Sequence, residues 1–544
     1  MSLRVLCVAP AYTHSFGTFD HAFSLLGVKA FMPCQGILTV AAHLPAHWHV
    51  RFVDENVGPM TDDDLRWADV VMTTGMHVQR ERIRALVRRA RAAGALTVLG
   101  GPSVSGEPGW YPEPDILHVG ELGDATERVI ARLERGVEPP DEQEVYVTEE
   151  RLPLEDFPMP AYHFLDMRDY LIASVQWSSG CPYRCEFCDI PELYGRKPRV
   201  KSPARIAAEL DAILANGNPG VVYFVDDNFV GNPKAATALL EELVRWQEER
   251  GFPVAFCCEG TLNAAKRPRI LALMREANFQ TIFCGIETPD RDALREMKKT
   301  QNAALEILDA VAAFNSYGLE VVSGIIVGLD SDTPESYDAI LEFIEASQIP
   351  LLTINVLYAL PRTPLWRRLE RDGRILDDPE RVSNVDFLLP YETVVEGWRK
   401  LVRSAYQPAA VHRRFRHQIA HTYPNRRELP ASRARLNVEN LRRGMAITGR
   451  MLWHIGARAD YRREFWRTAA FALRRGQVEG LFNAAMVSHH LISFSREAVR
   501  DGGEAAFYSP DTAPAVSPSR TAANSGGEWI AGPSPSSHVS RSAD

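Results

Sequence analysis

Short apolar runs alternate with amphipathic helical patterns along the first 136 residues, and this alternation restricts the fold more than any other feature. A strand, a helix and a parallel strand form a right-handed βαβ unit, and repeated units build an open sheet covered on both faces. We therefore predict an α/β, doubly wound (Rossmann-like) domain over residues 1–136, with ligands at the carboxyl ends of its strands. The predicted strands are Arg4–Val8, Val50–Val53, Asp69–Met72, Leu96–Leu99 and Ile116–Val119.

The alternation stops over residues 137–168, a proline-punctuated and acidic stretch that we interpret as a linker. A second alternating series occupies residues 169–390. Six strand–helix units over roughly 200 residues indicate a partial (β/α)6 barrel, whose active site forms at the carboxyl ends of the strands. The predicted strands are Ile172–Trp177, Val221–Val225, Val254–Cys257, Thr281–Gly285, Val321–Val327 and Leu352–Leu357.

Residues 391–500 have helical patterns and an unusual charge, with 20 Arg and one Lys against eight Asp and Glu. The whole chain nevertheless carries a net charge of −9, a total that hides this basic region. The cysteine group at residues 181–188 therefore argues against a dedicated nucleic-acid binder more strongly than the net charge does. Residues 501–544 are rich in Ser, Pro, Gly and Ala, so we predict a disordered tail. We find neither a signal peptide nor a run of about 18 apolar residues, and we expect a cytoplasmic protein.

The strongest chemical signal is the C-x3-C-x2-C group formed by Cys181, Cys185 and Cys188, directly after a predicted strand. Three thiolates on one tight loop suit an iron–sulfur cluster, which cysteines bind through sulfur. A structural zinc site needs a fourth Cys or His at similar spacing, and none follows nearby. The other five cysteines are scattered among apolar residues, as expected for core packing.

With this spacing, and with the aromatic Phe187 before the last cysteine, the chain resembles the radical S-adenosylmethionine (SAM) superfamily. The resemblance implies a [4Fe-4S] cluster whose open iron is chelated by SAM. Reductive cleavage of SAM then produces a 5′-deoxyadenosyl radical. The alternative is a purely structural metal loop. In such enzymes the cofactor carries the hard chemistry, and the protein positions it.

The resemblance also implies SAM contacts from Phe187 and from the ends of later barrel strands, where this chain has Asp226, Glu287, Gly324 and Gly328. Asp226 matches by position only, because the Gly-Gly-Glu that is usual in the family is absent. The carboxylates of Asp226 and Glu287 are equally suited to capping helices. Glycines in a strand, such as Gly324 and Gly328, also mark bulges or close backbone approach.

A doubly wound domain before a radical SAM barrel resembles the B12-dependent branch of the superfamily, which implies cobalamin over the carboxyl edge of the sheet. Strand-end loops that we expect to contact it follow the third, fourth and fifth predicted strands. Glycines there let the backbone approach a flat ligand, although they also make ordinary turns. The candidate residues are Thr74, Gly75, Gly100, Gly101, Gly120 and Glu121.

His14 lies in Tyr12-Thr-His14-Ser-Phe-Gly17, which departs from the D-x-H-x-x-G motif of mutase-type cobalamin domains because the Asp is missing. Ligand histidines usually have a carboxylate or carbonyl that orients the ring. We therefore do not expect His14 to ligate cobalt, and interpret it as a polar loop residue.

Over most of its length the chain resembles the hopanoid C-2 methyltransferase family. The resemblance implies that a 5′-deoxyadenosyl radical removes hydrogen from C-2 of ring A of a hopanoid, that methylcobalamin donates the methyl, and that a second SAM restores it. It also implies a one-electron donor of the flavodoxin or ferredoxin type. The segments that carry the resemblance include Ser15–Phe19, Phe52–Asn56, Gly100–Ser105, Cys188–Gly195, Tyr223–Val230 and Leu357–Leu365.

A hopanoid lies in membranes, so we expect peripheral contact with the inner membrane face. The apolar segments Gly480–Val487 and Leu491–Phe494 of the Arg-rich region are candidates to contact anionic lipid, unless these helices cover the barrel instead. Two other functions remain open. One is a B12 radical SAM methylase or cyclase acting on a tetrapyrrole or another lipid, and the other is a cobalamin- or redox-sensing binding protein.

Overall fold

The computed structural model describes residues 2–378, 381–429 and 438–501. Of the predicted disordered tail, only Asp501 falls within these ranges, and the rest lies outside the described residues. Among the described residues, no helix is both long and apolar enough to cross a membrane.

The first sheet has six parallel strands in the order β2-β1-β3-β4-β5-β6. The chain adds β2 on one side of β1 and then returns to add β3 on the other, so the strand order reverses between β1 and β3. This order confirms the doubly wound sheet, and its switch point is where such sheets bind ligands. The strands are β1 (Arg4–Ala9), β2 (His49–Asp54), β3 (Val70–Thr73), β4 (Leu96–Leu99), β5 (Ile116–Val119) and β6 (Glu144–Val147).

Helices cover both faces of this sheet, as the alternation of side chains along a strand requires. In β1, Val5 and Cys7 pack with Ile37 and Ala41 of α2. Leu6 and Val8 pack with residues of α3 and α4 on the other face. The helices are α1 (Asp20–Leu26), α2 (Gln35–His43), α3 (Asp62–Trp67), α4 (Arg80–Ala92), α5 (Pro102–Gly106) and α6 (Asp124–Arg135).

The stretch that we expected to be a linker contributes the sixth strand, β6, which pairs in parallel with β5. Only four residues long, β6 alternates half-buried and exposed positions at the edge of the sheet. So short an alternation does not stand out among the surrounding prolines, which explains why the sequence did not predict it.

The second sheet is also parallel, in the order β14-β13-β12-β11-β10-β7, which confirms the partial six-stranded barrel. Its strands are β7 (Ala173–Val175), β10 (Val221–Phe224), β11 (Ala255–Gly260), β12 (Phe279–Cys284), β13 (Glu320–Val327) and β14 (Leu352–Val356). Its helices are α8 (Pro203–Ala215), α9 (Pro233–Arg250), α10 (Pro268–Glu276), α11 (Arg291–Glu296), α12 (Thr300–Ala303), α13 (Ile307–Ser316), α14 (Ser336–Ser347) and α15 (Pro364–Arg371).

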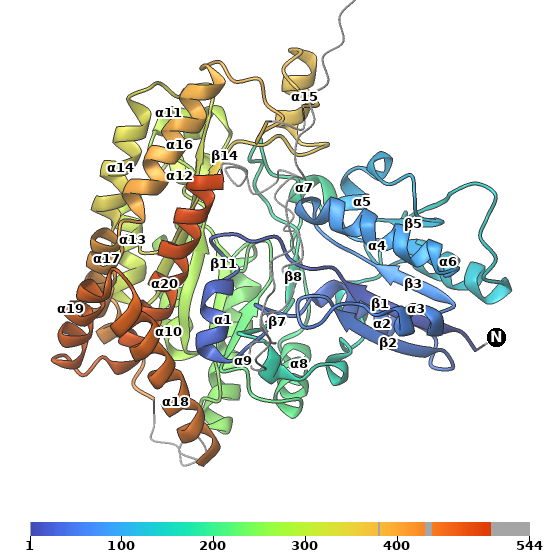
Figure 1. The fold of residues 1–544 in the computed structure, drawn as a ribbon, viewed down its shortest axis with the longest axis horizontal. Helices are drawn as coiled ribbons and strands as arrows, with labels where there is room; N and C mark the ends of the chain where they lie inside the picture. Colours follow the sequence, from blue (N-terminus) through green and yellow to red (C-terminus); the bar gives the residue numbers. More distant parts are fainter. Residues whose placement is uncertain (1, 379–380, 430–437, 502–544) are drawn as a thin grey trace, which may run out of the picture. The chain divides into compact units, whose positions relative to one another are not determined.

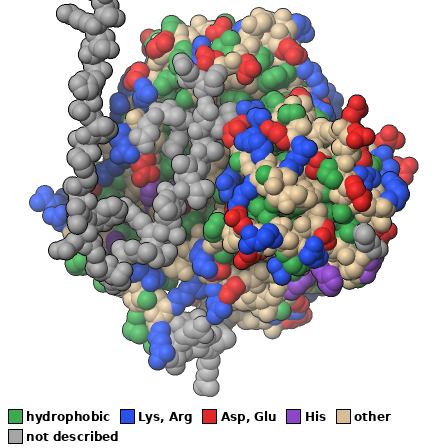
Figure 2. Space-filling view, turned by 45° about the vertical axis from the view of Figure 1, so that its right-hand side comes forward, with side chains coloured by type: hydrophobic (Ala, Val, Ile, Leu, Met, Phe, Trp, Pro, Cys, Tyr) green, Lys and Arg blue, Asp and Glu red, His purple; other side chains and the backbone are tan. Residues whose placement is uncertain are grey.

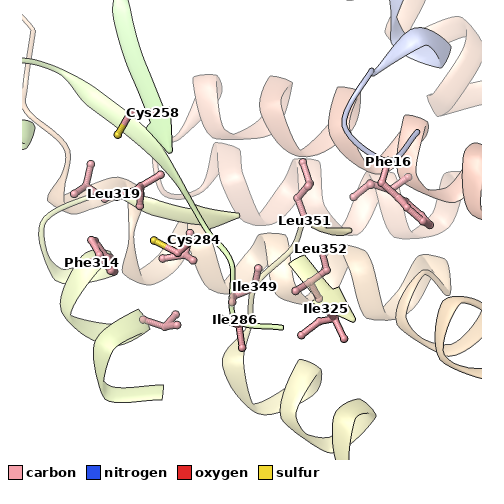
Figure 3. Close-up of a cluster of buried hydrophobic side chains, with 14 of the residues drawn as sticks. Phe16, Cys258, Cys284, Ile286, Phe314, Leu319, Ile325, Ile349, Leu351 and Leu352 are labelled. Carbon is pink, nitrogen blue, oxygen red and sulfur yellow. The ribbon is translucent and has the colours of Figure 1, made fainter. Parts of the chain in front are cut away.

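A segment from the N-terminal domain lies along the opening between the two edge strands, β7 and β14. Ala30 forms a parallel bridge with Tyr170, just before β7. Phe16 stacks on Tyr406 and meets Phe494 edge to face, and it belongs to the same buried cluster as the barrel core (Figure 3). The α1 helix in this segment lies beside α20 (Figure 1). The barrel core is thus completed by residues from the start of the chain.

Three C-terminal helices pack on the barrel and its helices: α16 on β14 and α14, α17 on α13, and α20 on α16 and α17 (Figure 1). This confirms the helical region and agrees with the alternative left open by the sequence, that these helices cover the barrel. In Gly480–Val487 and Leu491–Phe494, five of the seven large apolar side chains are buried in the core, and the other two, Phe482 and Val487, are partly buried against it. The C-terminal helices are α16 (Tyr391–Ala405), α17 (Pro408–His421), α18 (Val438–Met451), the π-helix η8 (Leu452–Arg458), α19 (Arg462–Leu473) and α20 (Val478–Asp501).

Candidate active site

The three cysteines lie on one loop that is closed at its base by the antiparallel pair β8 (Ser178–Ser179) and β9 (Arg199–Val200). The amide of Cys181 donates to the carbonyl of Gly195, 3.2 Å away. Gly180 has φ +95°, and a Cβ there would lie 2.8 Å from that carbonyl oxygen. Only glycine therefore lets the two ends of the loop meet at this point.

Two carboxylates at the end of β10 hold the backbone that leads into the cysteine loop. Asp226 accepts the amides of Trp177, at 2.9 Å, and of Ser178, and Asp227 accepts the amide of Gly180 at 2.7 Å. Burial raises the pKa of Asp226 to about 7, against the opposing effect of these amides. The second oxygen of Asp226 is buried and has no hydrogen-bond partner in the described part of the chain.

Amide side chains donate to two of the three sulfurs. Asn228 Nδ2 lies 3.8 Å from Cys181 Sγ, and Gln301 Nε2 lies 3.4 Å from Cys185 Sγ. Such hydrogen bonds stabilise sulfur ligands and tune an iron–sulfur cluster. No three His, Cys, Asp or Glu of the described residues meet closely enough to hold a single ion. Each ligand of a four-iron cluster binds a different iron, so the loop fits the cluster without such convergence.

A buried ion pair joins Glu287 to Lys299 beside the loop. Burial lowers the pKa of Lys299, but Glu287 and then Cys185 outweigh it, so the net shift is upward. Glu287 has φ +69°, which is strained for a side chain of its size. A Cβ at Gly285 would lie 2.2 Å from Glu287 Oε1 and 2.9 Å from Lys299 Nζ, so any larger residue there would displace the pair.

The structure brings together three of the residues predicted to contact SAM. The Phe187 ring lies 5.4 Å from Lys299 Nζ, and Gly324 lies beside the Glu287 carboxylate. Gly328 is separate: its amide donates to Asp332, and a Cβ would lie 2.7 Å from Phe387. Asp226 holds the loop as described, and its free buried oxygen suits the ammonium group of SAM.

Loops after β3 and β4 meet at the carboxyl edge of the first sheet, where we predict cobalamin. A Cβ at Gly101, whose φ is +96°, would lie 2.0 Å from Thr74 Oγ1 and 3.2 Å from the amide nitrogen of Gly75. The amide of Gly100 donates to the carbonyl of Thr73. These glycines thus hold the two loops against each other, and the exposed apolar Met76 follows on the same edge.

The remaining two predicted cobalamin residues have protein partners. The amide of Gly120 donates to Ser105 Oγ at 2.8 Å. Glu121 accepts from Arg199 at 2.5 Å and from the hydroxyl of Ser179 at 3.1 Å. Glu121 therefore ties the first domain to the hairpin that closes the cysteine loop.

His77, which the sequence did not single out, lies in the loop after β3 and is buried. Its Nδ1 lies 3.2 Å from Ser103 Oγ, which is 2.5 Å from the hydroxyl of Tyr111. Its Nε2 lies 3.5 Å from a carboxylate oxygen of Asp189, the residue after the last cysteine. His77 thus connects the predicted cobalamin edge with the cysteine loop. The sequence offered one indication that His77 could have a function, namely its position two residues after Gly75 at the end of a strand.

His14 has a carboxylate partner that its motif did not predict. Its Nδ1 pairs with Asp20 at the start of α1, and Asp20 also lies 3.6 Å from His490 of α20. The expectation that nothing orients the His14 ring was therefore wrong, because the partner follows the histidine instead of preceding it. These contacts attach the loop after β1 to the C-terminal helices.

The comparisons with known proteins agree with this site. Residues 175–344 match the model of the Radical SAM superfamily, and residues 363–503 match a domain of unknown function (DUF4070). The chain is 53% identical over 509 residues to the hopanoid C-2 methylase of Rhodopseudomonas palustris, covering 93% of this chain and 96% of the relative. The chain belongs to the hopanoid C-2 methylase family. It is also 33% identical to an uncharacterised methyltransferase of Synechocystis, over 90% of each chain.

Among solved structures, the fold is similar to two radical SAM enzymes. The cobalamin-dependent enzyme OxsB matches with a TM-score of 0.58 at 14% identity, covering 94% of this chain and 83% of OxsB. The methyltransferase TsrM of Kitasatospora setae matches with 0.55 at 16% identity, covering 92% and 100%. These matches confirm the predicted fold, and the superfamily match confirms a radical SAM enzyme with its cluster and SAM.

Lys299→Met removes a buried positive charge beside the cluster loop and leaves Glu287 unpaired. We expect the reduction potential of the reconstituted cluster to fall, on the order of tens of millivolts, because negative charge disfavours reduction. An anaerobic redox titration followed by electron paramagnetic resonance measures it. The neutral double variant Lys299→Met/Glu287→Gln should recover most of the change at equal iron content, and equal potentials in all three proteins would contradict the prediction.

Gly101→Ala places a methyl group against Thr74 and forces the two strand-end loops apart. We expect cobalamin affinity to fall at least about tenfold, because the clash and the positive φ both oppose the native loop. Bound cobalamin is measured by absorbance after desalting. Gly94→Ala is the matched control, since Gly94 also has positive φ (+86°) but a Cβ there meets nothing within 4 Å. Equal retention by both variants would contradict the cobalamin edge.

Proposed function

We propose that this enzyme methylates C-2 of ring A of a hopanoid lipid, using SAM and cobalamin. The observation that carries the proposal is the 53% identity to a hopanoid C-2 methylase over nearly the whole of both chains. An identity maintained from the first sheet to the C-terminal helices supports a shared substrate better than a shared cluster loop alone does, because substrates of one fold change through its loops.

When bound, the cluster and SAM supply hydrogen abstraction, and cobalamin supplies a methyl group. The protein's own part is to position these groups. Asp226 and Asp227 hold the backbone before Cys181, and Asn228 and Gln301 donate to sulfur. The Lys299–Glu287 pair places a fixed dipole without net charge beside the loop. Hydrogen abstraction from an unactivated carbon needs no strong base, so the site depends on placement and exclusion of water.

The cobalamin assignment is supported by the junction between the two domains. His77 lies at the edge where we place the cofactor and contacts Asp189, which follows the last cysteine. Glu121 forms an ion pair with Arg199 of the β8–β9 hairpin that closes the cysteine loop. A methyl donor on that edge would therefore face the cluster loop. The chemistry requires this, because the substrate must reach both the radical and the methyl group.

Three further partners follow from this chemistry. The hopanoid is the substrate, a flavodoxin or ferredoxin supplies one electron at a time, and the enzyme contacts the inner face of the membrane from the cytoplasm. We propose no nucleic-acid partner. Basic and acidic side chains are interspersed over the face of the first domain (Figure 2), which does not form the continuous basic field of a nucleic-acid binder.

The test is an anaerobic incubation of the reconstituted enzyme with SAM, cobalamin, a reductant and detergent-dispersed diplopterol or diploptene. We expect mass spectrometry to find a product with one additional methyl group on ring A. The Cys188→Ala variant, which lacks one cluster ligand, should form none. A product only with a tetrapyrrole or another lipid, or none with any substrate, would overturn the hopanoid assignment.

A further inference from the structure

Exposed apolar side chains are concentrated on one short part of the C-terminal region. Twelve large hydrophobic residues of the described chain are exposed, and seven of them lie between residues 441 and 478. Six belong to α18, η8 and α19, which we call the Arg–Trp hairpin (residues 438–473). They are Leu441, Met445, Leu452, Trp453, Trp466 and Leu473.

Helical spacing places these residues on a surface separate from the buried one. Leu441, Met445 and Leu452 are spaced i, i+4 and i+11 and so share one face of α18 and the start of η8. The buried residues of the same segment, Met451 and Ile455, lie on another face. In α19, Trp466 and Leu473 likewise share a face that differs from the one buried through Phe465 and Ala472. Each segment therefore has a second apolar stripe that the core does not use.

The same hairpin carries positive charge without matching carboxylates. Within the described residues, no carboxylate lies within salt-bridge distance of Arg458, Arg462 or Arg463 of the hairpin, or of Arg474, which directly follows it. Arg458 instead lies over the ring of Trp453, 4.8 Å from its centroid. An open hollow of about 660 Å³ between η8 and α19 is lined by Arg462, Arg463, Arg467 and Trp466. Arg467 pairs with Glu464, whereas the guanidinium groups of Arg462 and Arg463 have no carboxylate partner among the described residues and suit phosphate oxygens.

We infer that the Arg–Trp hairpin docks the enzyme on an anionic phospholipid bilayer. The inference rests on the proposed function, since a hopanoid has to be taken from a membrane. Tryptophan and long apolar side chains bounded by arginine are the composition of interfacial helices, with the apolar stripe among the acyl chains and the cations at the headgroups. An acidic electron-carrier protein would use the arginines but not the exposed Leu441, Met445 and Trp453.

The apolar part is tested by binding the full-length, reconstituted enzyme to vesicles of phosphatidylglycerol and phosphatidylcholine. We expect wild-type protein to sediment with phosphatidylglycerol-rich vesicles, and Leu441→Ser/Met445→Ser/Trp453→Ser to lose at least about tenfold in affinity. The matched control is Val145→Ser/Val147→Ser, which changes similarly exposed residues of β6 and should bind as wild type does. Equal binding by wild type, the triple variant and the control would overturn the inference.

The charged part is tested with Arg458→Gln/Arg463→Gln/Arg474→Gln at low ionic strength. Each arginine near an anionic surface contributes about fivefold, so we expect a loss of about a hundredfold. Arg66→Gln/Arg245→Gln/Arg295→Gln removes equal charge from exposed sites elsewhere and should have little effect. If the arginine variant instead weakens binding of a flavodoxin while vesicle binding is unchanged, the surface serves a protein and the inference is wrong.

Methylation assays separate this inference from the proposed function. With detergent-dispersed hopanoid, the hairpin variants should form product at the wild-type rate, whereas with vesicle-embedded hopanoid they should be slower in proportion to their lost binding. Wild type that methylates dispersed hopanoid but ignores anionic vesicles would overturn the docking surface alone. Wild type that binds vesicles but methylates no hopanoid would overturn the proposed function alone.

Discussion

The site depends on the hydrogen bonds between the residues that follow β10 and the backbone that leads into the cysteine loop. Asp226 and Asp227 accept backbone amides of residues 177, 178 and 180, and Asn228 donates to the first sulfur. These groups are neighbours because β7 and β10 pair in parallel, so their carboxyl ends meet at one edge. A carboxyl group buried as deeply as that of Asp226 needs such donors, so the segment after β10 has a structural role as well as a chemical one.

The second constraint is that neither domain is complete alone. The barrel leaves an opening between β7 and β14, and Phe16 and Ala30 from the N-terminal segment lie along it. In the other direction, Glu121 and His77 of the first domain contact the cysteine loop and its hairpin. Contacts between the domains thereby fix the position of the proposed methyl donor relative to the proposed radical source.

The local pattern of apolar and polar residues predicted most helices and strands. What it missed depends on contacts between residues far apart in the sequence. Five strands of the first sheet and six of the barrel were predicted because each is an apolar run between helical patterns, whereas four-residue β6 was not. The cysteine loop was predicted from spacing alone. The contacts of Lys299 and Gln301 with that loop were not, since they join residues over 100 positions apart. For the same reason, the sequence left open whether α20 faces lipid or covers the barrel, and the structure shows that it covers the barrel.

The account's central claim is that the loop of Cys181, Cys185 and Cys188 holds a cluster that cleaves SAM. The most direct test measures 5′-deoxyadenosine formed by anaerobically reconstituted enzyme with SAM and a reductant. We predict that the wild type and Cys258→Ala, which alters a buried cysteine outside the loop, form it, and that Cys181→Ala does not. Deoxyadenosine formation by Cys181→Ala at the wild-type level would contradict the account.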